Sequence, residues 1–271
     1  MRSYKEIRLI NYKHRRDEED EFYVNIDDWF KSPYSSIKAR YYIEGSSLIV
    51  FLLQNTKITP NQLSIFYGIL GLLSGFLLCL KNENMIFLGL IIFVLKGVVD
   101  WSDGLLARVT NQTSNIGHII DTWGSYIGYY SLIFGLGFIC FNANNEVFYL
   151  ILTLLIFLVS LIDFKLFSYH QLFYEVLNKK INLKNQQEEI VNAEKNTSNS
   201  ILKKCKIFLN NFLDDRARTL DLICLIVFFE VMFDNILFTK LVLFLFLLKK
   251  LLVFLGNFIE IIILKKMKNK I

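Results

Sequence analysis

The sequence is poor in proline and has no closely spaced cysteines. Only two prolines occur in 271 residues, which suits a helical bundle because proline breaks hydrogen bonds inside a helix. The four cysteines lie far apart, so the sequence indicates neither a redox pair nor a thiolate metal site; they are Cys79, Cys140, Cys205 and Cys224. The charged N-terminal segment lacks an apolar core, and a cleavable signal peptide is not expected there.

Long apolar runs dominate the chain instead. Hydrophobic residues make up 54% of the sequence, and several stretches reach the roughly 20 apolar residues that one membrane crossing requires. We therefore predict an all-α membrane protein with six transmembrane helices and an N-terminal interfacial helix. The predicted spans cover residues 60–80, 85–109, 117–141, 147–167, 218–234 and 238–264. The last span is the least clear, because Lys249 and Lys250 would lie near mid-membrane; a shorter span followed by an interfacial helix is the alternative.

Polar segments divide the chain. Residues 1–58 are predicted to be a cytoplasmic extension and an interfacial helix, because charged residues interrupt the first half of the 33–54 segment. Residues 59–271 are predicted to form the six-helix transmembrane domain, with a cytoplasmic loop at 168–214.

The start of the first span carries a clear signal for a helix N-terminus. Thr59 is a good N-cap residue, Pro60 would occupy the first helical position, and Gln62 completes the spacing of a capping box. The helix is therefore predicted to begin at Pro60.

Basic residues indicate the orientation. Lys and Arg gather before the first span, in the 168–214 loop and after residue 264, whereas the opposite loops offer little beyond Lys81 and Lys240. Because six spans place both termini on one side, the positive-inside rule predicts cytoplasmic termini and a cytoplasmic active site. Such charges are typical of loops that contact anionic lipid, with simple solvation as the alternative, and no nucleic-acid partner is expected.

Three aspartates lie around the junction of the second and third predicted spans. Asp100 and Asp103 are three residues apart, so their carboxylates share one helix face. Asp121 lies one turn into the next helix, and Ser125 follows one turn later. Because the 109–116 loop is short, we expect antiparallel neighbouring helices whose acidic faces converge at the cytoplasmic boundary. Three carboxylates repel one another unless a cation neutralises them, and oxygen ligands suit Mg²⁺ or Mn²⁺. Ordinary interfacial acids at helix ends are the alternative.

Small residues and an arginine accompany the aspartates. Gly104, Ala107, Gly117 and Gly124 leave room for close helix packing or for a ligand. Arg108 could bind a phosphate group, since guanidinium pairs well with phosphate oxygens.

This spacing resembles the family of CDP-alcohol phosphotransferases (CDP-alcohol phosphatidyltransferases), whose pattern is D-x2-D-G-x2-A-R-x8-G-x3-D-x3-D. The TPN sequence that opens the first span is also familiar from that family. One position departs from the pattern, because the family's last Asp, a metal ligand that is generally assigned as the base, corresponds to Ser125. The matching residues are Asp100, Asp103, Gly104, Ala107, Arg108, Gly117 and Asp121.

The resemblance implies a membrane enzyme of phospholipid biosynthesis. It would transfer a phosphatidyl or other phospho-alcohol group from a CDP-linked donor, such as CDP-diacylglycerol, to the hydroxyl of an acceptor alcohol and release CMP. The predicted partners are membrane lipid, donor, acceptor and a second copy in a homodimer. The implied site residues are Asp100, Asp103 and Asp121 for two Mg²⁺ or Mn²⁺ ions, Asp121 and Ser125 for catalysis, Gly104, Ala107, Arg108 and Gly117 for CDP, and Arg216 and Arg218 for a phosphorylated acceptor. For the last two, a role as a positive-inside anchor is the alternative.

Two other functions stay open. The Ser125 hydroxyl can coordinate Mg²⁺ but cannot act as a base at neutral pH, so the chain could be a catalytically silent member that binds CDP-lipid or a partner. Six spans with buried charges would also fit a transporter or channel; these charges include Lys96, Glu230, Lys249 and Lys250. A closed-ended cytoplasmic cavity would favour the transferase, and a two-sided path the transporter.

Overall fold

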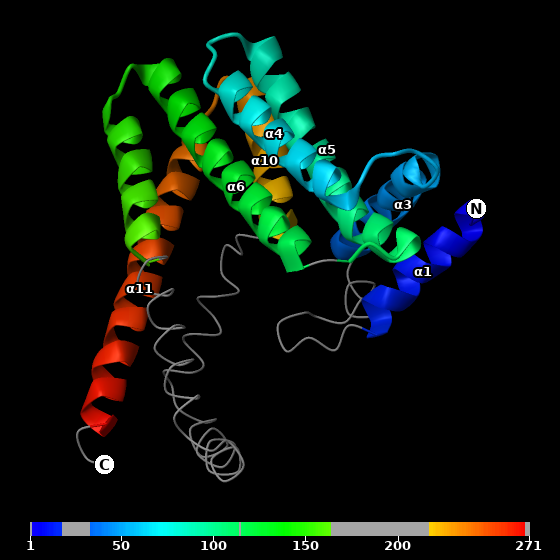
Figure 1. Ribbon diagram of the computed structural model, residues 1–271. Coiled ribbons are helices and arrows are strands. Elements are labelled where there is room, and N and C mark those ends of the chain that lie inside the picture. Colours follow the sequence, from blue (N-terminus) through cyan, green and yellow to red (C-terminus); the bar gives the residue numbers. More distant parts are fainter. Residues whose placement is uncertain (1, 18–32, 114, 164–216, 269–271) are drawn as a thin grey trace.

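The computed structural model describes residues 2–17, 33–113, 115–163 and 217–268, and these ranges contain helices and their connections but no strand. The helices are α1 (Tyr4–Asp17), α3 (Pro33–Leu53), α4 (Pro60–Leu78), α5 (Glu83–Thr110), α6 (Asn115–Asn144), the helix Phe148–Asp163, α10 (Ala217–Met232) and α11 (Leu237–Lys268) (Figure 1).

Four helices of the described ranges are long and apolar enough to cross a bilayer. They are α4, α5, residues Ile119–Ala143 of α6 and residues Leu237–Phe258 of α11. The expectation of an all-α membrane protein is confirmed at this level. Helices also occupy the described parts of the other two predicted spans, but Phe148–Asp163 and α10 have only 16 residues each. The count of six crossings therefore stays a prediction, as does the interfacial position of α3.

The predicted capping box opens α4. The Thr59 side chain accepts a hydrogen bond from the Gln62 backbone, and the Gln62 side chain accepts one from the Thr59 backbone N–H. This exchange satisfies donors that a helix start leaves open. The next helix, α5, ends at Asn111, which has a φ of 56° in the left-handed region that Asn tolerates at a C-cap.

Helix α4 connects the two helices that carry the aspartates. It packs along both α5 and α6, whereas α5 and α6 contact each other little (Figure 1). Small residues permit the close approach of α4 and α6: a Cβ added to Gly71 would lie 2.7 Å from Gly128 Cα, and one added to Gly75 would lie 2.6 Å from Ser131 Cβ. The expected neighbours α5 and α6 are therefore held together mainly through α4.

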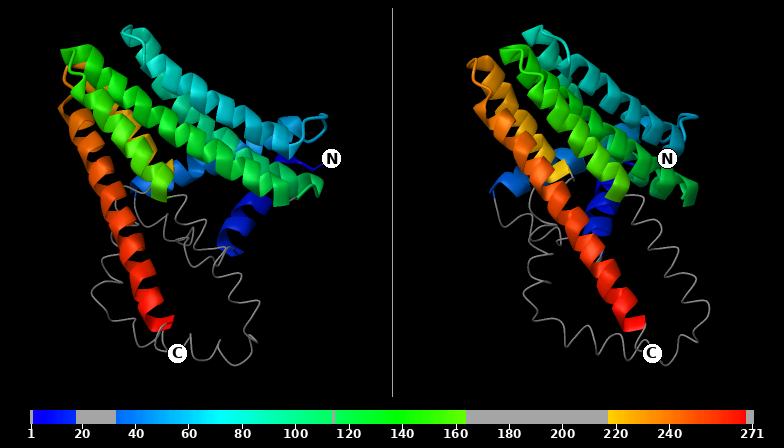
Figure 2. Two further views of the ribbon diagram at one scale, coloured as in Figure 1. Left: turned by 60° about the vertical axis from the view of Figure 1, so that its left-hand side comes forward. Right: turned by 90° about the vertical axis from the view of Figure 1, so that its left-hand side faces the viewer.

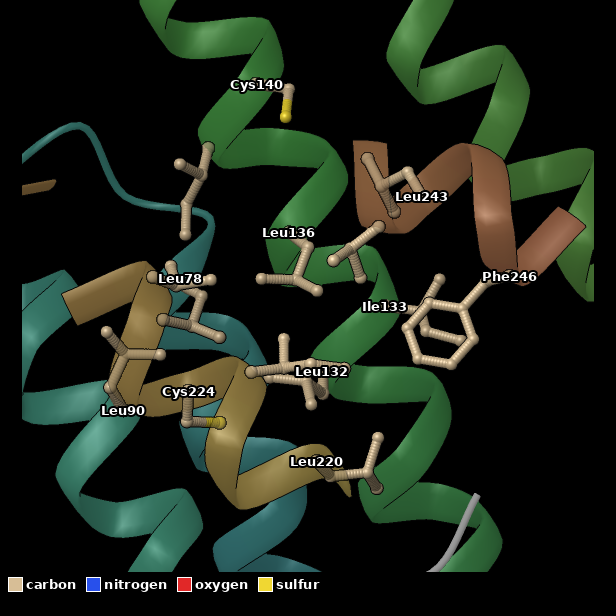
Figure 3. Close-up of a cluster of buried hydrophobic side chains, with 14 of the residues drawn as sticks. Leu78, Leu90, Leu132, Ile133, Leu136, Cys140, Leu220, Cys224, Leu243 and Phe246 are labelled. Atoms are coloured by element: carbon tan, nitrogen blue, oxygen red, sulfur yellow. The ribbon is translucent and has the colours of Figure 1, made fainter. Parts of the chain in front are cut away.

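The main apolar core lies between α4, α5, α6, the helix Phe148–Asp163, α10 and α11 (Figure 3). Cys140 and Cys224 are free and buried within it. Cys79 is also free and donates its thiol hydrogen to the Gly75 carbonyl oxygen. These three cysteines act as small apolar side chains, while Cys205 lies outside the described ranges.

Helix α11 is continuous from Leu237 to Lys268 and extends beyond the other helices toward the C-terminus (Figure 2). No break separates a span from an interfacial helix between its two ends. Lys249 is only 5% exposed, and the Lys250 ammonium lies 5.0 Å from the centre of the Tyr129 ring on α6. Both lysines are thus accommodated against protein, which reduces the cost of charge at membrane depth.

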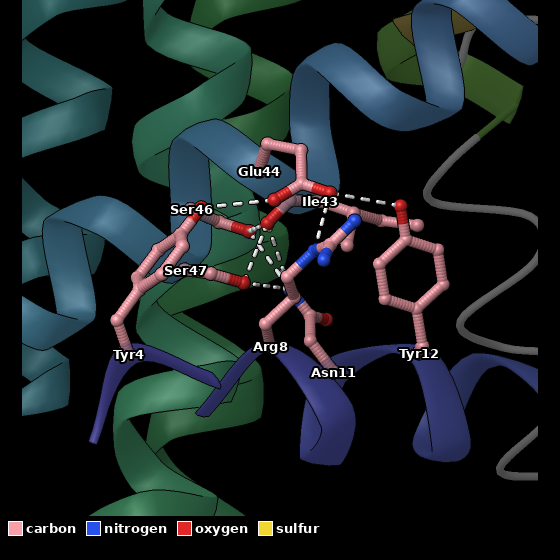
Figure 4. A network of polar contacts seen from close by, with 8 residues as sticks. All are labelled: Tyr4, Arg8, Asn11, Tyr12, Ile43, Glu44, Ser46 and Ser47. Atoms are coloured by element: carbon pink, nitrogen blue, oxygen red, sulfur yellow. Dashed lines mark hydrogen bonds and ion pairs between the residues drawn. The ribbon is translucent and has the colours of Figure 1, made fainter. Parts of the chain in front are cut away.

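Helix α1 is attached to α3 by a polar network (Figure 4). The Glu44 carboxylate accepts hydrogen bonds from Tyr4 (2.9 Å), Arg8 (2.6 Å) and Tyr12 (3.1 Å). Partial burial opposes ionisation of Glu44, but these hydrogen bonds outweigh burial and lower its pKa below the usual value. Part of the N-terminal extension, residues Tyr4–Asp17, is therefore a helix attached to α3.

Candidate active site

Asp103 is held by groups from two helices. Its side chain lies on α5 and is 8% exposed. One carboxylate oxygen accepts a hydrogen bond from the Ser64 hydroxyl of α4, and the other accepts one from the backbone N–H of Gly104. Both oxygens of this buried carboxylate thus have donors, as burial requires.

Asp121 is held by α4 as well. The Tyr67 hydroxyl donates a hydrogen bond to Asp121 Oδ1 at 2.6 Å and also contacts the backbone carbonyl oxygen of Asp121. The same hydroxyl lies 3.5 Å from Ser125 Oγ, one turn further along α6. One tyrosine therefore lies beside both positions that the sequence assigns to catalysis.

Asp100 lies one turn before Gly104 on α5 and is half-buried. Its carboxylate is attracted by the Lys96 ammonium and repelled by Asp121. Asp103 is repelled by both Asp100 and Asp121. The three aspartates therefore face one another closely enough to interact, which is the arrangement that a cation would stabilise.

The described residues contain no group of three acidic, histidine or cysteine side chains gathered closely enough to ligate one metal ion. Hydroxyl groups bind the carboxylates instead, through Ser64 and Tyr67. The donor chemistry, three carboxylates that repel one another, nevertheless fits a hard divalent cation. A cation bound by all three would require these side chains to move closer together.

The residues assigned to the CDP site are near Asp103. Gly104 leaves space for the Arg108 guanidinium, since a Cβ on Gly104 would lie 3.4 Å from Arg108 Nη1. Ala107 and Arg108 are half-buried on the last turns of α5, and Gly117 lies in the first turn of α6. The CDP assignment is compatible with these positions and stays a prediction.

The acceptor arginines are not placed. Arg216 lies outside the described ranges, and Arg218 belongs to the first turn of α10 with its side chain undescribed. The predicted acceptor role of both arginines stays untested.

A second polar cluster, whose α3 members Lys38 and Tyr42 sequence reasoning missed, lies beside Asp100. The Lys38 ammonium of α3 pairs with the Asp221 carboxylate of α10 at 3.0 Å, and both side chains are largely buried. The Tyr42 hydroxyl also donates to Asp221, and the Tyr42 ring stacks on Trp101 of α5 with 5.2 Å between ring centres. Burial and then the Asp221 charge raise the pKa of Tyr42, so its hydroxyl stays protonated as a donor.

Ser64, Tyr67 and Lys96 were also missed as site residues. The signal on α4 was a polar stripe in an otherwise apolar helix, because Ser64, Tyr67 and Gly71 recur at intervals of three and four residues. Such a stripe marks one face of a helix. It could have been assigned to the site only with the knowledge that α4 lies between α5 and α6.

An open apolar cavity of about 450 Å³ lies along α6. Side chains from α4, α6 and the helix Phe148–Asp163 line it, including Phe76, Trp123, Tyr126 and Phe157. Trp123 lies between Asp121 and Ser125 in the sequence, and Tyr126 directly follows Ser125.

Comparison with known proteins places the aspartates in a matched domain. Residues 57–185 match the family model described as CDP-alcohol phosphatidyltransferase. Proteins of Mycobacterium bovis and Mycobacterium tuberculosis, each named "Putative cardiolipin synthase", are 38% identical to the chain over 71 residues. That stretch is 26% of this chain and 33% of each relative, so the chain spans about a third of the length of the curated relatives it matches. Over residues 57–185 the chain therefore matches the CDP-alcohol phosphatidyltransferase family, a family of transferases of phospholipid synthesis.

Proposed function

We propose that this chain transfers a phosphatidyl group from a CDP-linked lipid donor to the hydroxyl of an acceptor alcohol and releases CMP. The observation that carries the proposal is the mutual placement of the motif aspartates: Asp100, Asp103 and Asp121 interact across α5 and α6 within the matched domain. Their spacing in the sequence and their proximity in space are independent supports for one site.

Asp100, Asp103 and Asp121 are proposed to hold Mg²⁺ or Mn²⁺. When bound, the cation would neutralise the diphosphate of the donor and the negative charge that develops on departing CMP. Arg108 is proposed to pair with the same diphosphate, since guanidinium supplies two parallel donors to phosphate oxygens. Gly104, Ala107 and Gly117 would let the nucleotide approach the backbone.

In the transfer step, the acceptor oxygen bonds to the phosphorus of the phosphatidyl group. The bond from that phosphorus to the bridging diphosphate oxygen breaks, and CMP leaves with the electron pair. The proton of the acceptor hydroxyl passes to the Asp121 carboxylate, which acts as the general base. Tyr67 would keep that carboxylate aimed at the acceptor, and the Ser125 hydroxyl could accept or donate a hydrogen bond beside it.

The apolar cavity supports a lipid donor. Its lining is mostly aromatic and aliphatic and includes Trp123, which lies between Asp121 and Ser125 in the sequence of α6. An acyl chain could pass from the bilayer onto this surface without leaving an apolar environment. A soluble CDP-alcohol would gain nothing from such a surface, so we propose CDP-diacylglycerol as the donor.

The acceptor is proposed from the names of the mycobacterial relatives. Cardiolipin contains two phosphatidyl groups joined through glycerol, so phosphatidylglycerol is the first acceptor to test. Arg216 and Arg218 stay candidates for binding the acceptor phosphate, and a homodimer stays a further expectation of the proposal.

A catalytically silent member is the second candidate function. Ser125 favours it, because the hydroxyl at this position lies beside Tyr67 and Asp121 but provides no charge of its own. In that case the chain would bind CDP-lipid without transferring its phosphatidyl group. The two candidates share the binding site and differ only in turnover.

The transporter alternative loses part of its motivation. Two of the buried charges that suggested it have structural partners. The Glu230 carboxylate accepts hydrogen bonds from the backbone of Phe238 and Thr239 at the start of α11. Lys96 lies over the aromatic rings of Tyr67 and Phe93.

The direct experiment is an assay of CMP release by the purified full chain in lipid vesicles. CDP-diacylglycerol serves as the donor and phosphatidylglycerol, glycerol phosphate and inositol phosphate as acceptors. EDTA should abolish release, and Mg²⁺ or Mn²⁺ should restore it. Tight CDP-diacylglycerol binding without any CMP release would instead support the silent member.

A further inference from the structure

Lys96 is a buried cation within the bundle. It lies one turn before Asp100 on α5 and is 8% exposed. Its side chain ends where α4 and α6 cross: a Cβ added to Gly128 would lie 2.6 Å from Lys96 Nζ, and one added to Gly71 would lie 3.3 Å from Lys96 Cε. Only glycine at 128 leaves the space that the ammonium fills.

The Lys96 ammonium is directed at the acidic site. Nζ lies 5.2 Å from the centre of the Tyr67 ring, whose hydroxyl binds Asp121. It also lies 5.4 Å from the centre of the Phe93 ring, and it attracts the Asp100 carboxylate. The described part of the chain shows no carboxylate within ion-pair distance of it. A buried charge at membrane depth is costly unless it serves a site.

The charge of Lys96 is relevant to the position of Ser125, where the family pattern has a fourth carboxylate. The family pattern has four carboxylates, whose charge two divalent ions would neutralise. This chain has three carboxylates, at Asp100, Asp103 and Asp121, and one ammonium, that of Lys96, which attracts the Asp100 carboxylate. The net charge of minus two that results would be neutralised by a single divalent ion.

We infer that Lys96 is a built-in cation that takes the place of the second divalent ion, so that the site holds one Mg²⁺ or Mn²⁺ per chain. The inference rests on the proposed function for its metal, and it concerns only the number of ions. It joins two departures that are separate in the sequence: the loss of a carboxylate at Ser125 and the presence of an ammonium at Lys96. Gly128, one turn after Ser125, leaves the space that the Lys96 ammonium occupies.

The location of Lys96 argues against a mere anchoring role. A lysine near the end of a span can extend its ammonium to the interface, but Lys96 lies near the middle of α5, which runs from Glu83 to Thr110. Its ammonium is turned inward, between α4 and α6, rather than toward a headgroup region.

The test counts Mn²⁺ ions bound to the full chain in detergent. Equilibrium dialysis with Mn²⁺ as the probe, read by electron paramagnetic resonance, gives the stoichiometry without any turnover. We expect one Mn²⁺ per wild-type chain and two in the double variant Lys96→Met with Ser125→Asp. The single variant Lys96→Met should bind its Mn²⁺ at least about tenfold more tightly, because a repelling charge has been removed.

Lys240→Met is the matched control. Lys240 also lies 5.2 Å from a tyrosine ring, that of Tyr149, but near the start of α11 and away from the aspartates. Its loss should change neither the stoichiometry nor the affinity. Gly128→Ala provides a variant that keeps the lysine but displaces its ammonium, and it should tighten Mn²⁺ binding as Lys96→Met does.

Two Mn²⁺ ions per wild-type chain would overturn the inference and leave the proposed transferase in place. An unchanged affinity in both Lys96→Met and Gly128→Ala would also overturn it. No bound Mn²⁺ in any variant would overturn both the inference and the metal-dependent function. One bound ion in a chain that never releases CMP would keep the inference and favour the silent member.

Discussion

The Tyr67 hydroxyl of α4 donates a hydrogen bond to Asp121 Oδ1 of α6, with 2.6 Å between the two oxygens. This contact ties the proposed base to a helix that carries none of the motif aspartates. Ser64 binds Asp103 from the same face of α4. The aspartates of α5 and α6 are thus positioned by the helix between them.

Tyr67→Phe should lower kcat/KM for CMP release by roughly 10- to 100-fold, because a hydrogen bond to a charged group contributes about 1.5–3 kcal/mol. The ring stays, so the melting temperature in detergent should change little. Tyr149→Phe, a buried tyrosine far along the chain from the motif, is the matched control. Equal activity in Tyr67→Phe and wild type would show that Asp121 needs no support from α4.

Asp221→Asn should destabilise the fold. Lys38 would be left buried without its carboxylate, and breaking such a pair costs about 3–5 kcal/mol. The double variant Lys38→Met with Asp221→Asn should recover much of the loss, which denaturant unfolding in detergent would measure. Asp234→Asn, at an exposed position beyond α10, is the control. If Asp221→Asn lowers the free energy of unfolding only slightly, and adding Lys38→Met recovers none of that loss, the two residues are not an energetically coupled pair.

Attachment of α1 should depend on pH. The pKa of Glu44 is lowered in the folded protein, so its contribution is fully present above the ordinary value of 4.5 and is lost as the pH falls through the lowered value. Hydrogen exchange of α1 should therefore increase as the medium is acidified below pH 4.5. Glu44→Gln should remove that dependence and give faster exchange already at neutral pH. Exchange in the wild-type chain that is insensitive to acid would contradict the role of Glu44.

Ser125→Asp should raise CMP release. Asp121 is proposed both to bind the cation and to accept the proton, and a second carboxylate would share these tasks. General-base assistance typically contributes about 10²–10⁴-fold, and the gain in CMP release should approach this range only if Asp121 is a poor base in the wild type. Ser125→Asn, which has the shape of Asp without its charge, should give no gain. A chain that is inactive with either residue would point to the silent member.

Sequence signals within single segments predicted the helices well. The capping box at Thr59 and Gln62 fixed the start of α4, and apolar length predicted the helices of the bundle. Both signals act within one segment, so the sequence contains them completely. The spacing of Asp100 and Asp103 likewise placed two carboxylates on one helix.

Contacts between helices could not be predicted in the same way. The short loop suggested that α5 packs directly on α6, but glycines at Gly71 and Gly128 let α4 come between them. Tyr67 and Lys96 reach the site only because of that crossing. Lys38 and Asp221 are far apart in the sequence, so nothing local marks them as partners.

The most direct test of the transferase is CMP release from CDP-diacylglycerol, compared between the wild-type chain and Asp103→Asn in vesicles that contain phosphatidylglycerol. The account predicts Mg²⁺- or Mn²⁺-dependent release by the wild type. Asp103→Asn should release no CMP and bind no CDP-diacylglycerol, although its helix content is unchanged. Donor binding that persists in Asp103→Asn, or a wild-type chain that releases no CMP with any acceptor, would contradict it.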